Sequence, residues 1–250
     1  MVTFSFFSPK GGVGKTTLTL LFAAYAAYYL KLRVLVVDFE STARIQDFRD
    51  KDNLQAIKPG SPLHNYMKTR EVQRAYSILS LGAESYSEND LRVITRQINR
   101  IVAEDKYDLL VLDFSALYSP SKPEAWLFSN QLVDLVYIPH NTDIQERQEA
   151  FRLGTLLQKE GVPFRFLWYR LQDKLIKDPS KLIRVEEQML QAYNMRYSAH
   201  RIRAFNKAME AADIQCFVRN TLCWPDRYVK MCCPVLISLF DEILTDLKRL

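Results

Sequence analysis

The stretch of sequence that decides the fold is Lys10-Gly11-Gly12-Val13-Gly14-Lys15-Thr16-Thr17. An apolar run, residues 2–7, precedes it, and a longer apolar segment, residues 18–30, follows it. This order of strand, glycine-rich loop and helix is typical of a phosphate-binding loop; the alternative is an ordinary glycine turn that happens to contain GKT. Glycines let successive backbone N–H groups point into one concavity, which accepts anionic oxygens above the positive end of a helix. Lys15 would then contact the β- and γ-phosphates, and the Thr16 hydroxyl would bind Mg²⁺.

The loop departs from the general form of this motif at its start. Pro9 stands where the general form has a glycine, and a second lysine, Lys10, precedes Gly11. In this variant, KGGxGK[ST], the segment resembles the ParA/MinD family of deviant Walker A ATPases. The resemblance implies that residues 10–17 bind ATP with Mg²⁺. It also implies a homodimer that forms on ATP binding, in which Lys10 reaches the nucleotide of the partner subunit.

Length and composition favour one α/β domain over residues 1–250, because 48% of the 250 residues are apolar and no linker interrupts them. Apolar runs alternate with amphipathic stretches, which predicts a mostly parallel twisted sheet with helices on both faces, as in P-loop NTPases. The expected strands are residues 2–7, 33–38, 108–113, 133–139, 163–168 and, more weakly, 214–218. The expected helices are residues 15–31, 71–79, 88–104, 124–131, 143–160, 180–193, 200–212 and 235–250.

Acidic residues end two of the expected strands, where open α/β sheets bind ligands. Asp113 matches the Walker B aspartate of the family, which holds Mg²⁺ through a water molecule. Asp38 matches the first acid of the family's D-x-D motif, but Glu40 stands where the second aspartate orients the attacking water. A displacement of roughly 1 Å can cost about 10²-fold in rate, so Glu40 puts the rate of hydrolysis in question and leaves nucleotide binding intact.

Recognition of the nucleotide base leaves a weaker trace in the sequence. An NKxD-type guanine motif is missing, which favours ATP over GTP. The family often contacts adenine through an asparagine at the end of a late strand, and here Tyr169 and Arg170 occupy that place. Either side chain could stack on the base.

Charge is concentrated in the C-terminal part of the chain. Residues 1–150 contain 17 Lys and Arg against 18 Asp and Glu, whereas residues 151–250 contain 17 against 11, so the second part alone accounts for the net charge of +5. A basic, largely helical third, residues 178–250, permits nonspecific DNA binding; the alternative is an ordinary solvated face. Candidate contacts to DNA phosphates are Arg196, Arg201, Arg203, Arg219 and Lys230.

Three functions fit these observations. The first is a ParA-type ATPase for partitioning or maintenance of plasmid, chromosomal or mobile-element DNA, reset by a protein partner that stimulates hydrolysis. The second is a regulator or assembly factor with little or no catalysis, which Glu40 favours. The third is a MinD-like ATPase bound to a membrane by its tail. The tail carries an apolar stripe, but its polar face is mainly acidic, so we expect it to pack on the core instead.

The remaining sequence features exclude other classes of protein. No secretory signal precedes the loop, so we expect a cytoplasmic protein. The cysteines are Cys216, Cys223, Cys232 and Cys233, and their spacing does not match a metal or iron–sulfur motif. We therefore expect reduced, partly buried thiols.

Overall fold

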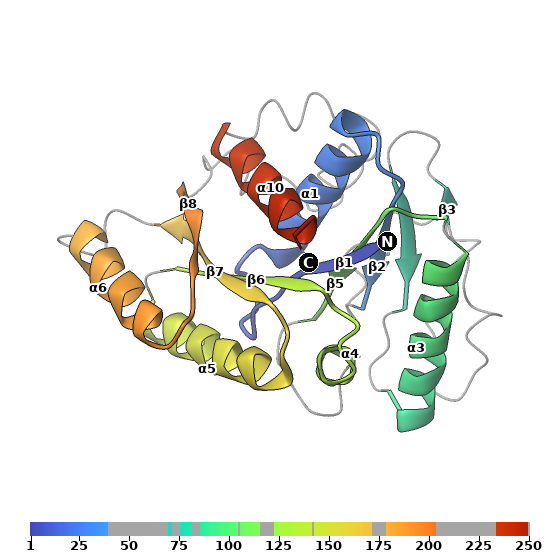
Figure 1. Cartoon of the computed structure of the whole chain (residues 1–250), viewed down its shortest axis with the longest axis horizontal. Coiled ribbons are helices and arrows are strands. Elements are labelled where there is room, and N and C mark those ends of the chain that lie inside the picture. Colours follow the sequence, from blue (N-terminus) through green and yellow to red (C-terminus); the bar gives the residue numbers. More distant parts are fainter. Residues whose placement is uncertain are drawn as a thin grey trace.

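A parallel sheet forms the centre of the molecule. The computed structural model describes residues 1–39, 70–71, 76–81, 86–104, 106–115, 123–141, 143–171, 179–203 and 234–249. The eight strands follow the order β3-β4-β2-β5-β1-β6-β7-β8 (Figure 1). They are β1 Val2–Phe6, β2 Val34–Asp38, β3 Arg70–Glu71, β4 Ser77–Ser80, β5 Leu109–Asp113, β6 Leu135–His140, β7 Phe164–Leu171 and β8 Tyr197–Arg203. Only β3 is antiparallel to its neighbour, so the expected mostly parallel sheet is confirmed.

Helices cover both faces of this sheet and give three layers (Figure 1). One face carries α1 Lys15–Tyr29 and α10 Pro234–Leu247, and the other carries α3 Glu88–Ala103, α4 Pro123–Ser129, α5 Ile144–Glu160 and α6 Pro179–Ala192. Successive side chains of a strand point to opposite faces, which divides the core into two clusters. In β2, Val34 and Val36 pack under α1, whereas Leu35 and Val37 belong to the opposite cluster.

Two expected helices are wrong in the parts that the structure describes, and residues 72–75 and 204–212 lie outside those parts. The segment expected as helix 71–79 overlaps the end of β3 and most of β4, and Leu35 to Asp38 of β2 pair with Ser77 to Ser80 of β4. The segment expected as helix 200–212 begins instead as part of β8, where Arg201 pairs with Trp168. In both places a short apolar pattern fits either structure, and pairing with a neighbouring strand decides the outcome. The weak strand at 214–218 lies outside the described residues.

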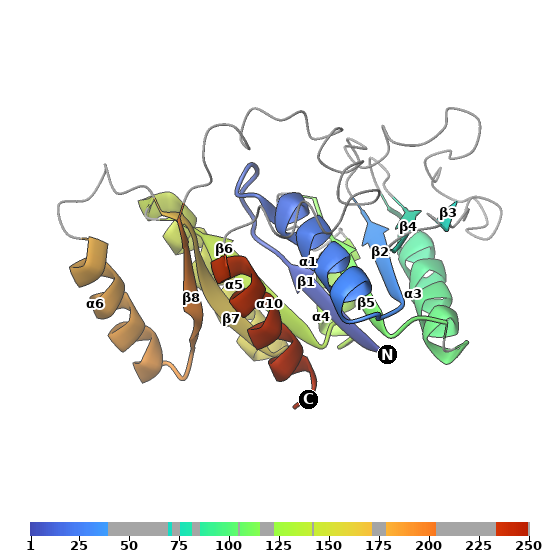
Figure 2. The same ribbon diagram turned by 90° about the horizontal axis from the view of Figure 1, so that it is seen from above.

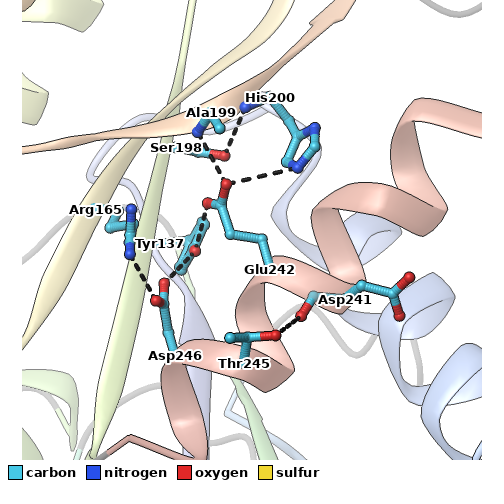
Figure 3. A network of polar contacts seen from close by, with 9 residues as sticks. All are labelled: Tyr137, Arg165, Ser198, Ala199, His200, Asp241, Glu242, Thr245 and Asp246. Atoms are coloured by element: carbon cyan, nitrogen blue, oxygen red, sulfur yellow. Dashed lines mark hydrogen bonds and ion pairs between the residues drawn. The ribbon is translucent and has the colours of Figure 1, made fainter.

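The C-terminal helix α10 is fixed to the sheet by apolar and polar contacts. Its apolar stripe is at most 8% exposed and consists of Leu236, Leu239, Phe240, Ile243, Leu244 and Leu247. On its polar side, the Tyr137 hydroxyl lies 2.8 Å from carboxylate oxygens of both Glu242 and Asp246 (Figure 3). Arg165 donates to Asp246 at 2.6 Å, and the backbone N–H of Ala199 donates to Glu242 at 2.9 Å. The expected packing of the tail on the core is therefore confirmed.

The helices that the structure describes include none with the length and apolar character needed to cross a bilayer.

Candidate functional site

The glycine-rich loop connects β1 to α1 at the carboxyl edge of the sheet (Figure 2). Gly12 and Gly14 adopt positive φ angles of 76° and 88°, which side chains other than glycine rarely tolerate. A Cβ atom on Gly14 would come within 2.6 Å of Cε1 of the buried Tyr169, whereas a Cβ on Gly12 would meet no atom within 4 Å. Position 14 therefore requires glycine because of its φ angle and because no side chain would fit, whereas Gly12 faces open space. The Tyr169 ring lies directly against the loop at Gly14.

The two lysines of the loop have different surroundings. The Lys15 side chain is buried, and its Nζ donates to the backbone oxygen of Lys10 at 3.0 Å. The Lys10 side chain extends instead to the start of α5, where its Nζ lies 2.9 Å from Glu146 Oε1 and 3.5 Å from Asp143 Oδ1. The hydrogen bond with Glu146 raises the pKa of Lys10. In the single chain, both acids thus hold the lysine that distinguishes the deviant loop.

The turn that carries these two acids is itself tightly bonded. Asp143 caps α5 by accepting from the backbone N–H of Glu146 at 3.0 Å, and this bond lowers the pKa of Asp143. Asn141 Oδ1 accepts from the backbone N–H of Asp143 at 2.7 Å, while Glu146 Oε2 accepts from that of Asn141 at 3.3 Å. Sequence reasoning missed both acids. The sequence places both acids at the start of the expected helix 143–160, but their position beside Lys10 depends on the pairing of β6 with β1.

The expected carboxylates meet at the same edge. Asp38 ends β2 and Asp113 ends β5, the two residues are direct partners in the parallel register, and both are fully buried. The backbone N–H of Phe39 donates to the Asp113 carbonyl oxygen at 2.8 Å, so the pairing continues past the strand ends. Because β5 also pairs with β1, these acids lie at the strand ends beside the loop.

This arrangement fits nucleotide phosphates together with a divalent cation. A cradle of glycine N–H groups and Lys15 suit the phosphates, and the half-buried Thr16 begins the helix beneath them. Hydroxyl and carboxylate oxygens are the donors that Mg²⁺ prefers, and Thr16, Asp38 and Asp113 supply them at one edge. Val13 is buried within the loop. Glu40 lies outside the described residues.

The candidate DNA contacts are only partly described. Arg196 and Arg201 are exposed and line one groove of about 570 Å³ beside β8 and the end of α6. Arg201 donates to both carboxylate oxygens of Glu187, at 2.9 and 3.1 Å. The Arg203 side chain, Arg219, Lys230 and all four cysteines lie outside the described residues.

Comparison with known proteins relates this site to a group of nucleotide-binding domains. The CobQ/CobB/MinD/ParA nucleotide binding domain matches residues 4–210. MinD cell division protein from Aquifex aeolicus has a similar structure, with a TM-score of 0.65 and 14% identity over 98% of both chains. MinD from Pyrococcus horikoshii, complexed with Mg-ADP, gives 0.62 at 17% identity over 97% of this chain and 95% of the other. A putative plasmid partition protein from Borrelia burgdorferi, bound to AMPPNP, gives 0.62 at 13% identity over 97% and 98%.

These structural similarities show a shared fold, and the family match goes further. No curated protein sequence matches the chain. The family match nevertheless spans most of the chain and includes the glycine loop, both buried aspartates and the acids that hold Lys10. The chain therefore belongs to the CobQ/CobB/MinD/ParA family of nucleotide-binding domains.

Proposed function

We propose that this protein is an ATP-dependent molecular switch of the ParA type, which binds ATP with Mg²⁺ and hydrolyses it slowly. The observation that carries this proposal is the meeting of the glycine cradle, Lys15 and two buried aspartates at one sheet edge. Thr16 and, through a water molecule, Asp113 would hold Mg²⁺, which neutralises phosphate charge when bound. Glu40 would orient the attacking water. Related structures contain Mg-ADP or AMPPNP, which supports the choice of an adenine nucleotide.

The two loop lysines have separable roles in this proposal. Lys15→Ala should abolish binding of a fluorescent ATP analogue, because the buried ammonium of Lys15 serves the phosphates of its own chain. Lys10→Ala should retain nucleotide binding but lose the ATP-dependent homodimer, measured by light scattering. A Lys10→Ala protein that still forms the dimer with ATP would show that the role assigned to Lys10 is wrong.

The dimer is proposed to act in DNA partitioning or maintenance through nonspecific DNA binding. The excess of basic residues in 151–250 and the groove that contains Arg196 and Arg201 support this role. Anisotropy of a labelled duplex should rise only with ATP, and the affinity should fall steeply from about 50 to about 200 mM salt. Glu187→Gln should strengthen binding, because it frees Arg201 for a phosphate. Binding that ignores ATP or salt would contradict the partition role.

Two further parts of the proposal concern catalysis and location. We place the switch in the cytoplasm, where a still unidentified protein partner would stimulate hydrolysis. Phosphate release by the ATP-bound dimer distinguishes a slow ATPase from a regulator that has lost catalysis at Glu40. A MinD-like membrane tail is disfavoured because the apolar stripe of α10 is buried.

A further inference from the structure

A pocket lined with aromatic rings lies between α5, α6 and the sheet, and we call it the histidine pocket. Its volume is about 580 Å³, which is within the range of sites for small molecules. Five rings contribute to its lining: His140, Phe151, Phe166, Tyr193 and Tyr197. Among the described residues that line it, none belongs to the glycine loop, and neither Asp38 nor Asp113 is present. The histidine pocket is therefore separate from the candidate nucleotide site.

The inner wall of the histidine pocket is built from rings that pack on one another. His140 and Trp168 are direct partners in the pairing of β6 with β7, and the centres of their rings are 4.4 Å apart. The Tyr197 ring stacks on Trp168 at 5.2 Å, with 6° between the two planes. A wall of flat rings favours a planar ring system as the ligand, because stacking of aromatic rings is favourable.

Three buried polar atoms at this wall have no hydrogen-bond partner among the described residues. They are His140 Nε2, Arg147 Nε and Trp168 Nε1. His140, which lines the pocket, is only 2% exposed, and Trp168 beside it is fully buried. Buried polar atoms without partners are rare in proteins, because each has lost its hydrogen bonds with water. Three of them at one wall indicate that a bound molecule supplies the missing partners.

The direction of the missing hydrogen bonds follows from the bonds that are already made. His140 Nδ1 lies 3.1 Å from the carbonyl oxygen of Asn141, which can only accept, so Nδ1 carries the proton of the ring. Burial lowers the pKa of His140 to about 4, so the ring is neutral and its Nε2 atom is an acceptor. Arg147 Nε and Trp168 Nε1 can only donate. The ligand must therefore offer a donor as well as an acceptor.

Charge at the inner wall indicates that this part of the ligand is neutral. The Arg147 guanidinium forms an ion pair with Glu186, and the Tyr197 hydroxyl donates to the second oxygen of Glu186 at 3.3 Å. The charge of Arg147 is thus balanced within the wall, and only its Nε–H remains without a partner. An inner group with a full negative charge would compete with Glu186 for Arg147, whereas a neutral ring would not.

We propose that the histidine pocket binds a purine nucleoside. The edge of a purine base carries an N–H donor next to an acceptor, which are the two groups that His140 Nε2 and Arg147 Nε–H lack. Two fused rings also cover more of the ring wall than one ring does. The rest of the nucleoside would cover the apolar rim of the pocket, where Ile144 is 65% exposed and Met189 57%. This site does not depend on the proposed function, because the glycine loop binds phosphates and the histidine pocket binds a base.

Isothermal titration calorimetry of the full chain with adenosine and with guanosine tests this site. Magnesium and tripolyphosphate, which carry no base, are added first so that they occupy the glycine loop. At least one nucleoside should then bind with a dissociation constant below about 1 mM, and the better of the two identifies the base. Caffeine is a purine in which methyl groups replace every N–H of the rings, so it offers no donor to His140. It should bind at least about tenfold more weakly.

Two substitutions distinguish the histidine pocket from the nucleotide site. His140→Leu removes the acceptor, and Arg147→Lys keeps the positive charge beside Glu186 but removes the Nε–H donor. Each should weaken nucleoside binding about tenfold and leave the affinity for ATP unchanged. Glu149→Gln is the matched control, because Glu149 lies on the same helix but does not line the pocket. It should bind the nucleoside as tightly as the wild type does.

Three results would overturn the nucleoside site. They are the absence of binding of both nucleosides at about 1 mM, caffeine binding as tight as that of the better nucleoside, and unchanged nucleoside affinity in both variants. Circular dichroism checks that the variants are folded, and the comparison with caffeine decides the matter on the wild type alone. Failure of the wild type to bind ATP, with normal nucleoside binding, would contradict only the proposed function.

Discussion

Release of Lys10 from α5 should favour the ATP-bound dimer. In the single chain its ammonium lies 2.9 Å from Glu146 Oε1 and 3.5 Å from Asp143 Oδ1. In the proposed ATP-bound dimer, each subunit would give up these contacts so that Lys10 could reach the nucleotide of the partner subunit. Glu146→Gln removes the nearer charge but keeps an oxygen that accepts from the backbone N–H of Asn141. The start of α5 should therefore survive the substitution.

The size of the effect follows from the exposure of the ion pair. The Lys10 side chain is 39% exposed and that of Glu146 is 8% exposed, so solvent screens the pair and its net contribution is about 1 kcal/mol. A dimer breaks two such pairs, which doubles the effect to about 2 kcal/mol. At 1.4 kcal/mol for each factor of ten, the dissociation constant of the ATP-bound dimer should fall about 30-fold in Glu146→Gln.

Sedimentation at several protein concentrations with saturating ATP measures this constant. Glu149→Gln is the matched control, because Glu149 lies on the same helix but its described ion pair is a weak one with Arg152 at 3.9 Å. It should leave dimerisation unchanged. A dissociation constant for Glu146→Gln that equals or exceeds the wild-type value would refute the view that α5 restrains Lys10.

Three other predictions concern the loop, a buried histidine and the C-terminal helix. Gly14→Ala should weaken ATP binding at least about tenfold in a nucleotide titration. The added Cβ would press on Tyr169, and a φ of 88° is unfavourable for alanine. Normal affinity would disprove this close packing. Burial, with a smaller effect of Arg147, lowers the pKa of His140 from 6.5 to about 4. As pH falls, the unfolded chain takes up a proton at this histidine before the folded chain does. The free energy of unfolding should therefore be unaffected above pH 6.5 and should fall by about 3 kcal/mol as pH decreases to about 4. Urea unfolding of His140→Leu should lack this decrease, and identical pH profiles for wild type and variant would contradict the prediction. Phe240→Ala should lower the free energy of unfolding by about 3–5 kcal/mol, because the fully buried ring packs on α1, and an unchanged melting temperature would argue against that packing.

The sequence predicts the centre of the site better than its surroundings. Asp38 and Asp113 each follow four apolar residues, so their places at strand ends could be read from the local pattern. The contact of Asp143 and Glu146 with Lys10 could not be predicted from the local pattern, because it depends on β6 lying beside β1 in the sheet. Likewise, the segment from Ser77 to Ser80 becomes a strand because it pairs with β2. The strand β8 was not predicted because it lies at the edge of the sheet, pairs on one side and contains charged residues such as Arg201, so it lacks the apolar pattern of a buried strand.

The position of α10 has a consequence for synthesis of the protein on the ribosome. Phe22 and Tyr25, in the helix that begins at the phosphate loop, pack on Phe240, and the Tyr25 hydroxyl donates to Asp241 at 2.7 Å. The side of α1 that packs on α10 therefore stays exposed until residues 234–247 have been translated. A nascent chain would present these aromatic rings to chaperones until then. A stop codon before residue 234 would leave every phosphate-loop residue encoded but would remove the helix that covers α1.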